Sequence, residues 1–305
     1  MDIDRPTPGD REVLVKVFVT TVNRTDCGFR AAKPWIVRFF SGLIRPRARV
    51  LGTEFAGVVE AVGRDVESFG VGDRVFGFSE PRFGAHAEYL VIREDGAIAT
   101  IPDGQTFDEA AANTEGSHYA LAIVRAAGIG SGDSVLVNGA TGAIGSAAVQ
   151  LLKGLDASVT AVCGTEHIEL VRRLGAGRVI DYTVEDFTMD QERFDVVLDA
   201  VGKSSFGRVK HLLKPRGIYL STDLGPLSMN PLLALITPLF GRKRVMFPVG
   251  GKFDRGMATY LREQVESGVF RPVIDRTYPL DRIVEAYRYV ETGGKVGNVL
   301  IRVAP

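Results

Sequence analysis

The stretch SVLVNGATGAIGSAAVQ, residues 134–150, decides the fold of this chain. A short apolar strand at 134–137 is followed by Gly139, Gly142 and Gly145 and then by the start of a helix. Glycines let the backbone turn tightly and approach a pyrophosphate, and the first N–H groups of a helix face negative charge. The spacing is G-x-x-G-x-x-G and not the common G-x-G-x-x-G. The string alone therefore fits a dinucleotide turn and an ordinary glycine turn equally well.

The segments around this stretch alternate between strand and helix. Helical character is expected at 107–127, with an interruption near Gly116, at about 144–154 and at 165–174. Further apolar strands are predicted at 158–162, 178–180, 194–200 and 217–221. This alternation predicts a doubly wound parallel sheet. The glycine turn then follows the first strand of the sheet, where dinucleotide sites are built, and this context favours nucleotide binding.

The chain before residue 107 has a different texture. Short apolar strands cut by glycines predict an all-β, barrel-like domain over residues 1–106, with strands at 12–22, 51–62, 73–78, 84–92 and 97–101. Near the end of the chain, helices at 254–266 and 279–290 precede a strand at 296–303. The proline-punctuated apolar segment 224–247 has no clean period. It could be a hydrophobic lid, a dimer contact or a connection through the core.

Composition narrows the class of protein. The 305 residues carry 37 basic and 37 acidic side chains, so no electrostatic attraction to nucleic acid or to an anionic membrane is expected. The most apolar run, 231–240, is too short to span a membrane, and residues 1–10 do not have the pattern of a signal peptide. Cys27 and Cys163 are the only cysteines, which is typical of a reducing cytoplasm. We expect a cytoplasmic protein without nucleic acid or membrane as a partner.

Several strings, spread over nearly the whole chain, form a combined signature: VNRTD (22–26), GTEFAGVVEAVG (52–63), GDRVFG (72–77), GAHAEYL (84–90), NGATGAIGSAAVQ (138–150), LGAGRVIDY (174–182), FDVVLDAVG (194–202) and GKVGNVLI (294–301). With these strings the chain resembles the medium-chain dehydrogenase/reductase superfamily, in its zinc-independent quinone oxidoreductase-like branch.

The resemblance implies an architecture. A GroES-like β-barrel domain at 1–106, completed by about 268–305, is expected with a Rossmann domain at 107–267, a doubly wound parallel sheet. The active site is expected in the cleft between the two domains. Relatives usually carry one more strand pair before the segment matching 6–17, so we expect an edge of the first sheet to be missing. A homodimer joined through the edges of the Rossmann sheets, at the strand 244–249, is also implied.

The resemblance also bears on metal and on chemistry. The catalytic zinc positions of zinc-dependent relatives correspond to Asn23, Thr53 and Asn113, none of which is a good zinc ligand. Without a Lewis acid a simple carbonyl is hard to reduce, whereas quinones and carbonyl-conjugated alkenes are already electrophilic. We predict no metal, and hydride transfer from NAD(P)H to such a substrate. The alternatives are a cofactor-binding regulatory or structural protein and, less favoured, an alcohol dehydrogenase.

The predicted site residues follow from the same strings. Asn23 is expected on the nicotinamide side, or else only stabilises the turn before Asp26. The second Rossmann strand has no acid at its end until Glu166, and Thr165 could bond a 2′-phosphate, so NADP is favoured and NAD stays open. The predicted cofactor-binding residues are Ser117, Gly139, Ala140, Thr141, Gly142, Ala143, Ile144, Gly145, Cys163, Gly164, Thr165, Tyr182, Val201, Gly202, Gly250, Gly251, Lys252, Gly297 and Asn298.

Overall fold

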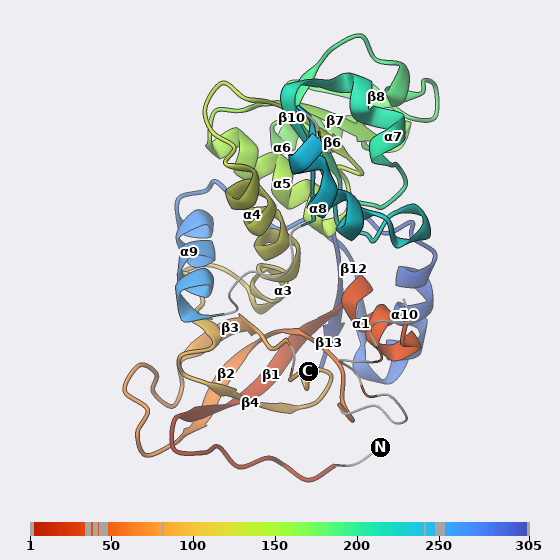
Figure 1. Ribbon diagram of the computed structural model, residues 1–305. Helices are drawn as coiled ribbons and strands as arrows, with labels where there is room; N and C mark the ends of the chain where they lie inside the picture. Colours follow the sequence, from red (N-terminus) through yellow and green to blue (C-terminus); the bar gives the residue numbers. More distant parts are fainter. Residues whose placement is uncertain are drawn as a thin grey trace. The chain divides into compact units, whose positions relative to one another are not determined.

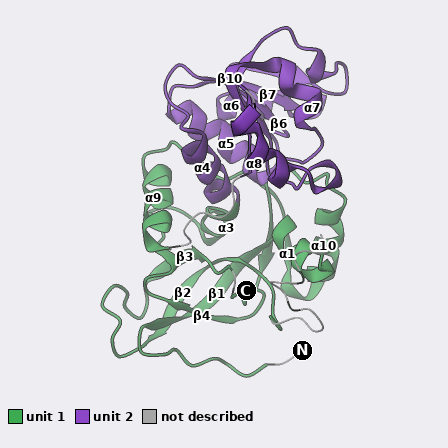
Figure 2. Ribbon diagram, viewed as in Figure 1, with its two compact units in different colours: residues 1–115, 252–305 green, residues 116–251 purple. Residues whose placement is uncertain are grey.

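The computed structural model describes residues 3–33, 38, 42, 48–80, 82–240, 242–247 and 254–303. The chain divides into two compact units (Figures 1 and 2). Unit 1 comprises residues 1–115 and 252–305, and unit 2 comprises residues 116–251. The first unit extends past residue 106 because Ala110, Ala111 and Ala112 pack into its core. The domain bounds expected from the sequence, 1–106 with 268–305 and 107–267, stay a prediction.

Unit 1 is built on a sheet that has seven strands within the described residues. Its order is β12-β13-β1-β2-β3-β5, and β4 pairs with β1 off this path. Strand β1 runs antiparallel to β2, β4 and β13, whereas β12 and β13 are parallel. The strands are β1 (Glu12–Val22), β2 (Glu54–Val62), β3 (Arg74–Phe78), β4 (Tyr89–Arg93), β5 (Ala97–Thr100), β12 (Ile274–Pro279) and β13 (Asn298–Arg302).

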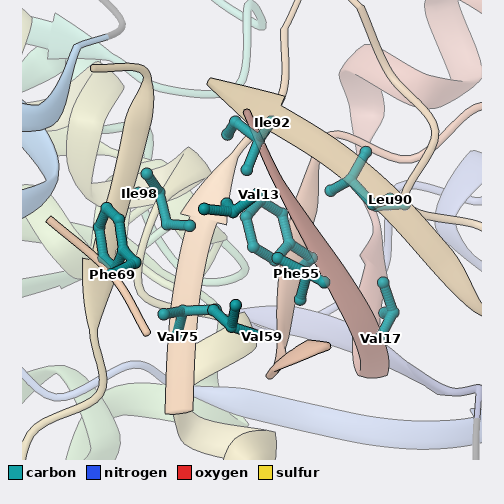
Figure 3. Close-up of a cluster of buried hydrophobic side chains, with 11 residues drawn as sticks. Val13, Val17, Phe55, Val59, Phe69, Val75, Leu90, Ile92 and Ile98 are labelled. Carbon is teal, nitrogen blue, oxygen red and sulfur yellow. The ribbon is translucent and has the colours of Figure 1, made fainter. Parts of the chain in front are cut away.

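Alternating valines of β1 build the main core of this unit. Val13, Val15 and Val17 are fully buried on one face of the strand, as the period of a strand requires. Figure 3 shows Val13 and Val17 in one cluster with Phe55 of β2. Burying one such side chain stabilises the fold by about 1.5–3 kcal/mol. The predicted strands of the first domain are thus present, and β12 is an addition that the sequence pattern did not indicate.

The helices of unit 1 include one that the sequence interpretation missed. Helix α1 (Arg24–Ala31) begins at Asn23, which caps it in a reciprocal capping box with Asp26. The other helical segments are α3 (Phe107–Ala111), α9 (Arg255–Glu266), η5 (Leu280–Arg282) and α10 (Ile283–Glu291). The helix predicted from residue 279 therefore starts later, because β12 continues to Pro279.

Unit 2 contains a six-stranded sheet in the described residues, and all its strand pairs are parallel. Read from one edge, the order is β8-β7-β6-β9-β10-β11, which places the first strand of the unit at the centre. This is the strand order of a doubly wound dinucleotide fold, so the predicted parallel sheet is confirmed. The strands are β6 (Ser134–Asn138), β7 (Ser158–Cys163), β8 (Arg178–Asp181), β9 (Phe194–Asp199), β10 (Leu213–Ser221) and β11 (Arg244–Met246).

Short helices connect these strands: α4 (Glu115–Ala127), α5 (Ala143–Gly154), η1 (Thr165–His167), α6 (Ile168–Leu174), η2 (Phe187–Met189), α7 (Phe206–Val209), η3 (Lys210–Leu212), η4 (Pro226–Ser228) and α8 (Asn230–Phe240). The apolar segment 224–247 thus contains α8, with Pro238 inside it. The Thr237 hydroxyl donates to the Leu233 carbonyl and accepts from the Val245 amide, which ties α8 to β11. None of the described helices is both long enough and apolar enough to cross a bilayer.

Candidate functional site

The glycine turn, residues 139–145, joins β6 to α5 at the carboxyl edge of the parallel sheet. Gly139 has φ +80°, a conformation that side chains disfavour. A Cβ on Gly145 would lie 2.1 Å from the Gly139 carbonyl oxygen, so only glycine lets the helix pack this closely on the turn. Two of the three predicted glycines are therefore required by the fold itself.

Gly142 is different, because space beside it is open. It is the N-cap of α5 and has no side-chain capping bond. An added Cβ would meet only the Gly139 carbonyl oxygen, at 3.7 Å. The first hydrogen bond of the helix runs from the Ser146 amide to the Gly142 carbonyl, at 2.8 Å. The backbone amides of residues 143–145 therefore have no carbonyl partner within α5. Open space beside Gly142, at the N-terminus of the helix, fits the binding of a pyrophosphate there.

The end of β9 borders the glycine turn. A Cβ on Gly139 would lie 2.3 Å from a methyl group of Val201, so the Val201 side chain covers this glycine. The buried Asp199 carboxylate holds the following loop: it accepts from the Asn138 side chain at 3.0 Å and from the Ser204 amide at 2.8 Å. Sequence reasoning named Val201 and Gly202 and missed Asp199. An acid that ends a buried apolar strand was the available signal.

The ends of β7 and β8 lie side by side, with Cys163 opposite Asp181. The Tyr182 hydroxyl would lie 3.3 Å from a Cβ on Gly164, so the predicted Cys163, Gly164 and Tyr182 are neighbours. Burial raises the pKa of the Cys163 thiol to about 11, so this cysteine is no nucleophile.

The Thr165 hydroxyl, predicted as a donor to a 2′-phosphate, makes a different bond. It donates to the Asp181 carboxylate at 2.5 Å. Hydrogen bonds from Thr165 and Thr183 lower the pKa of Asp181, so the group is ionised at neutral pH. A negative charge thus lies where sequence analysis saw only small neutral residues.

In unit 1, Asn23 is almost fully buried and serves the structure of α1. Its side-chain oxygen Oδ1 accepts from the Asp26 backbone amide at 2.9 Å, and its side-chain NH2 group donates to the Thr53 hydroxyl at 2.7 Å. The turn-stabilising role considered for Asn23 is therefore present. Its predicted nicotinamide role stays a prediction.

Unit 1 also holds a group of charges, here called the acid cluster: the buried Asp26, Glu54 and Glu115 and the half-buried Lys295. One Glu54 oxygen accepts from the Thr114 hydroxyl at 2.8 Å, the Thr114 amide at 3.1 Å and the Glu115 amide at 2.6 Å. The other accepts from the Thr21 hydroxyl at 2.6 Å. The sequence interpretation missed this cluster.

Burial shifts the titration of these groups. Desolvation raises the pKa values of Glu54 and Glu115, and lowers that of Lys295. The two opposite charges partly offset the effect of burial: Lys295 lowers the pKa of Glu115, and Glu115 raises the pKa of Lys295. Burial raises the pKa of Asp26 to about 8, although its carboxylate accepts from the amides of Asn23 and Gly52.

Three of the remaining predicted residues lie close in the chain to members of the acid cluster, with Lys295 donating to the Gly297 carbonyl, and three fall outside the described residues. Ser117 is buried in the first turn of α4. Asn298 begins β13 and donates to the Val273 carbonyl from both its backbone, at 2.8 Å, and its side chain, at 3.0 Å. Gly297 packs against that same carbonyl. Gly250, Gly251 and Lys252 fall outside the described residues.

The positions aligned with catalytic zinc ligands are held in hydrogen bonds. Thr53 accepts from Asn23, and Asn113 exchanges two side-chain bonds with Gln105, at 3.0 and 3.1 Å. Within the part of the chain that the structure describes, no group of three His, Cys, Asp or Glu is arranged to hold a metal ion. His86 contacts the Thr21 carbonyl through Nε2 at 2.8 Å, and burial lowers its pKa to about 4.

Comparison with known proteins identifies the class. The family model for the alcohol dehydrogenase GroES-like domain matches residues 9–103, and that for a zinc-binding dehydrogenase matches residues 174–301. The 2-methylene-furan-3-one reductase of Solanum lycopersicum is 33% identical, over 98% of this chain and 74% of its own. The chain belongs to the medium-chain dehydrogenase/reductase superfamily, and its predicted GroES-like and Rossmann folds are confirmed.

Two further relatives narrow the branch. The chloroplastic NADPH-dependent alkenal/one oxidoreductase of Arabidopsis thaliana is 30% identical, over 98% of this chain and 74% of its own. The solved structure of the quinone oxidoreductase from Coxiella burnetii has a TM-score of 0.87 and 25% identity, and the match covers 100% of this chain and 94% of that one. The predicted quinone oxidoreductase-like branch is thus confirmed.

Proposed function

We propose that this chain is an oxidoreductase that transfers a hydride from a nicotinamide dinucleotide to a quinone or to an alkene conjugated with a carbonyl group. The observation that carries this proposal is the glycine turn, with open space beside Gly142 at the carboxyl edge of the sheet. The names of the relatives, a furanone reductase, an alkenal/one oxidoreductase and a quinone oxidoreductase, support the substrate class.

Different residues of unit 2 would bind different parts of the dinucleotide. The amides at the start of α5 would hold the pyrophosphate, with the helix dipole behind them. Asp199 fixes the loop that holds Val201 and Gly202, and these two residues would line the ribose. Gly164 and Tyr182 would contact the adenosine. When bound, the reduced nicotinamide supplies the hydride.

Zinc plays no part in this proposal. The side chains at the three ligand positions, Asn23, Thr53 and Asn113, are amides and a hydroxyl bonded to protein partners. Zinc prefers thiolate and imidazole ligands, which these residues do not offer. The proposed substrates need no Lewis acid, because the conjugated carbonyl already polarises the bond that accepts the hydride.

NADP is the proposed cofactor, and Asp181 is expected to limit its preference over NAD. The name of the Arabidopsis relative supports NADPH. The Asp181 carboxylate opposes it, because it engages the Thr165 hydroxyl and would repel a 2′-phosphate nearby. We therefore expect measurable activity with both cofactors.

The setting of the protein is proposed from the same features. Strand β11 forms an edge of the described sheet in unit 2, so two copies could pair there as a homodimer. With two distant cysteines and a net charge of zero, the proposed location is the cytoplasm and the proposed partner is the small-molecule substrate alone, with neither nucleic acid nor membrane.

The decisive experiment follows NADPH oxidation at 340 nm with a panel of quinones and enones, with and without a metal chelator. Turnover that the chelator leaves unchanged is expected. The matched control is Gly142→Asp, which should fold and yet lose activity because its carboxylate would occupy the phosphate position. Chelator-sensitive turnover with a simple alcohol would instead indicate a zinc alcohol dehydrogenase. NADPH-induced thermal stabilisation without any turnover would indicate a regulatory protein.

A further inference from the structure

A cavity lies in unit 2, at the edge of the parallel sheet opposite to the glycine turn. It has a volume of about 650 Å³. Three segments that line it immediately precede parallel strands: Arg193 before β9, Lys210 and His211 before β10, and Lys243 before β11. Residues that precede parallel strands lie at the amino edge of the sheet, whereas the glycine turn follows β6 at the carboxyl edge. The cavity is therefore separate from the proposed dinucleotide site.

The polar lining of this cavity is basic. No aspartate or glutamate is among its described lining residues, and its basic side chains belong to Arg193, Lys210, His211, Arg242 and Lys243. Lys243 donates to the Lys210 carbonyl at 2.7 Å, and Arg193 donates to the His211 carbonyl. Across the described chain, the four lysine and arginine side chains of this lining form no ion pair with a carboxylate. Positive charge without a paired carboxylate is therefore concentrated at this cavity, although the net charge of the chain is zero.

The crowding of these cations has an electrostatic cost. Burial lowers the pKa of Lys243, and the neighbouring charges of Arg193 and Lys210 lower it further. A bound anion would reverse that repulsion, because opposite charges at short range favour the charged form of lysine.

The other wall of the cavity is apolar. Ile236 and Phe240 come from α8, and Phe206 comes from the first turn of α7. The Phe240 side chain is 88% exposed, and the Ile236 side chain is 38% exposed. Large exposed apolar side chains next to convergent polar groups are typical of small-molecule sites, and the volume lies in their usual range of roughly 300–1,000 Å³.

We propose that this cavity binds an amphipathic anion, a single molecule with a carboxylate or phosphate head and a hydrocarbon body. The basic residues at the amino edge would contact the head, and Phe206, Ile236 and Phe240 would cover the body. A purely polar anion would leave the apolar wall exposed, and a neutral apolar ligand would leave the cations uncompensated. The site is independent of the proposed reductase activity, so its occupation can be measured as binding alone.

Calorimetric titration of the purified full chain with dodecanoate, below its micellar concentration, tests the proposal. Binding is expected for dodecanoate and not for acetate, which lacks the chain, or for dodecyltrimethylammonium, which has the same chain and a cationic head. Affinity should rise about fourfold per methylene from octanoate to dodecanoate. In the double variant Arg242→Gln/Lys243→Gln the affinity should fall at least about tenfold, because two charged contacts are lost.

The control Arg173→Gln removes one exposed positive charge from α6 and should leave dodecanoate binding unchanged. Thermal unfolding and NADPH binding of the double variant establish that it is folded. Equal binding of dodecanoate and dodecyltrimethylammonium would overturn the proposal, as would unchanged binding by a folded double variant. Capture by anionic phosphatidylglycerol vesicles without any binding of monomeric dodecanoate would also overturn it, since the surface would then dock on membranes and hold no single ligand.

Discussion

The glycine turn of unit 2 and the acid cluster of unit 1 are built in opposite ways. The turn depends on missing side chains. A Cβ on Gly145 would lie 2.1 Å from a backbone oxygen, whereas a Cβ on Gly142 would enter open space. The acid cluster works because side chains converge: Glu54 accepts four hydrogen bonds from residues that lie 33 to 61 positions away in the chain.

The difference predicts opposite sensitivities. A local turn is damaged by adding atoms, and its neighbours in the sequence determine the outcome. A long-range cluster is damaged by removing atoms, because each lost acceptor leaves a buried donor without a partner. The same contrast explains why a motif search finds the turn and passes over the cluster. Substitutions at each place can test it.

The largest effect is expected for Glu54→Ala. It removes four acceptor contacts within a fully buried site and should lower the free energy of unfolding by about 4 kcal/mol. Glu54→Gln is the matched control and should cost about 1 kcal/mol. Its oxygen can still accept from Thr114 and Glu115, and its NH2 group can donate to the Thr21 hydroxyl. Urea unfolding of both variants checks this. Equal losses for Ala and Gln would show that the negative charge matters and the hydrogen bonds do not.

Gly145→Ala should lower the free energy of unfolding by about 3 kcal/mol, because the added Cβ forces α5 away from the turn. Thermal unfolding of the variant measures this loss.

Gly142→Asp should instead leave the fold intact and weaken cofactor binding. Asp is a good N-cap residue, so stability should be unchanged or slightly higher, while affinity for NADPH should fall about a hundredfold. Thermal unfolding and NADPH titration separate the two effects, with Gly142→Ala as a neutral reference. A destabilised Gly142→Asp would contradict the open space beside Gly142.

Asp26 predicts a pH dependence with a definite sign. Its pKa is about 8 in the folded chain against an ordinary value of 3.8, mainly through burial and then through the neighbouring Glu54 and Glu80 charges. Between these values the folded state keeps a proton that the unfolded chain has released, so stability falls as pH rises. The slope is at most about 1.4 kcal/mol per pH unit.

Asp26→Asn should remove this slope between pH 7 and 8. In that window His86, which lies 3.9 Å from Asp26, is neutral in the folded state, and in the unfolded chain it is protonated to no more than about a quarter, so it adds little. Unfolding free energies at four pH values measure the difference between the two proteins. Parallel curves for the wild type and the variant would mean that Asp26 is ionised in the folded state.

Sequence patterns predicted the backbone of this protein better than its side-chain chemistry. The strands around β6 were predictable because period and length are local, and the glycine turn because its spacing is local. Helix α1 was missed because its capping residues, Asn23 and Asp26, also fit a turn. Helix α8 was missed because it contains Pro238 and has no clean apolar period.

The partners of Glu54 and Asp199 could not have been predicted from spacing. Asp199 bonds Asn138 from a strand that only the parallel register brings alongside. Glu54 receives its bonds from two segments, Thr21 in β1 and the adjacent Thr114 and Glu115, which only the fold of unit 1 brings together. The sequence shows only that each acid lies in an apolar strand, and this pattern does not predict which residues the acid contacts.

The smallest expected effect concerns Asp181, where a local motif and a longer-range contact meet. Thr165, chosen from the sequence as a phosphate donor, already donates to the Asp181 carboxylate at 2.5 Å. Asp181→Asn removes the negative charge and frees the hydroxyl, so the ratio of kcat/KM for NADPH to that for NADH should rise about fivefold. Glu185→Gln removes an equal charge from the same loop, at an exposed side chain, and should leave the ratio unchanged. If both variants shift the ratio equally, the charge of the whole loop selects the cofactor, and the bond between Thr165 and Asp181 has no special role.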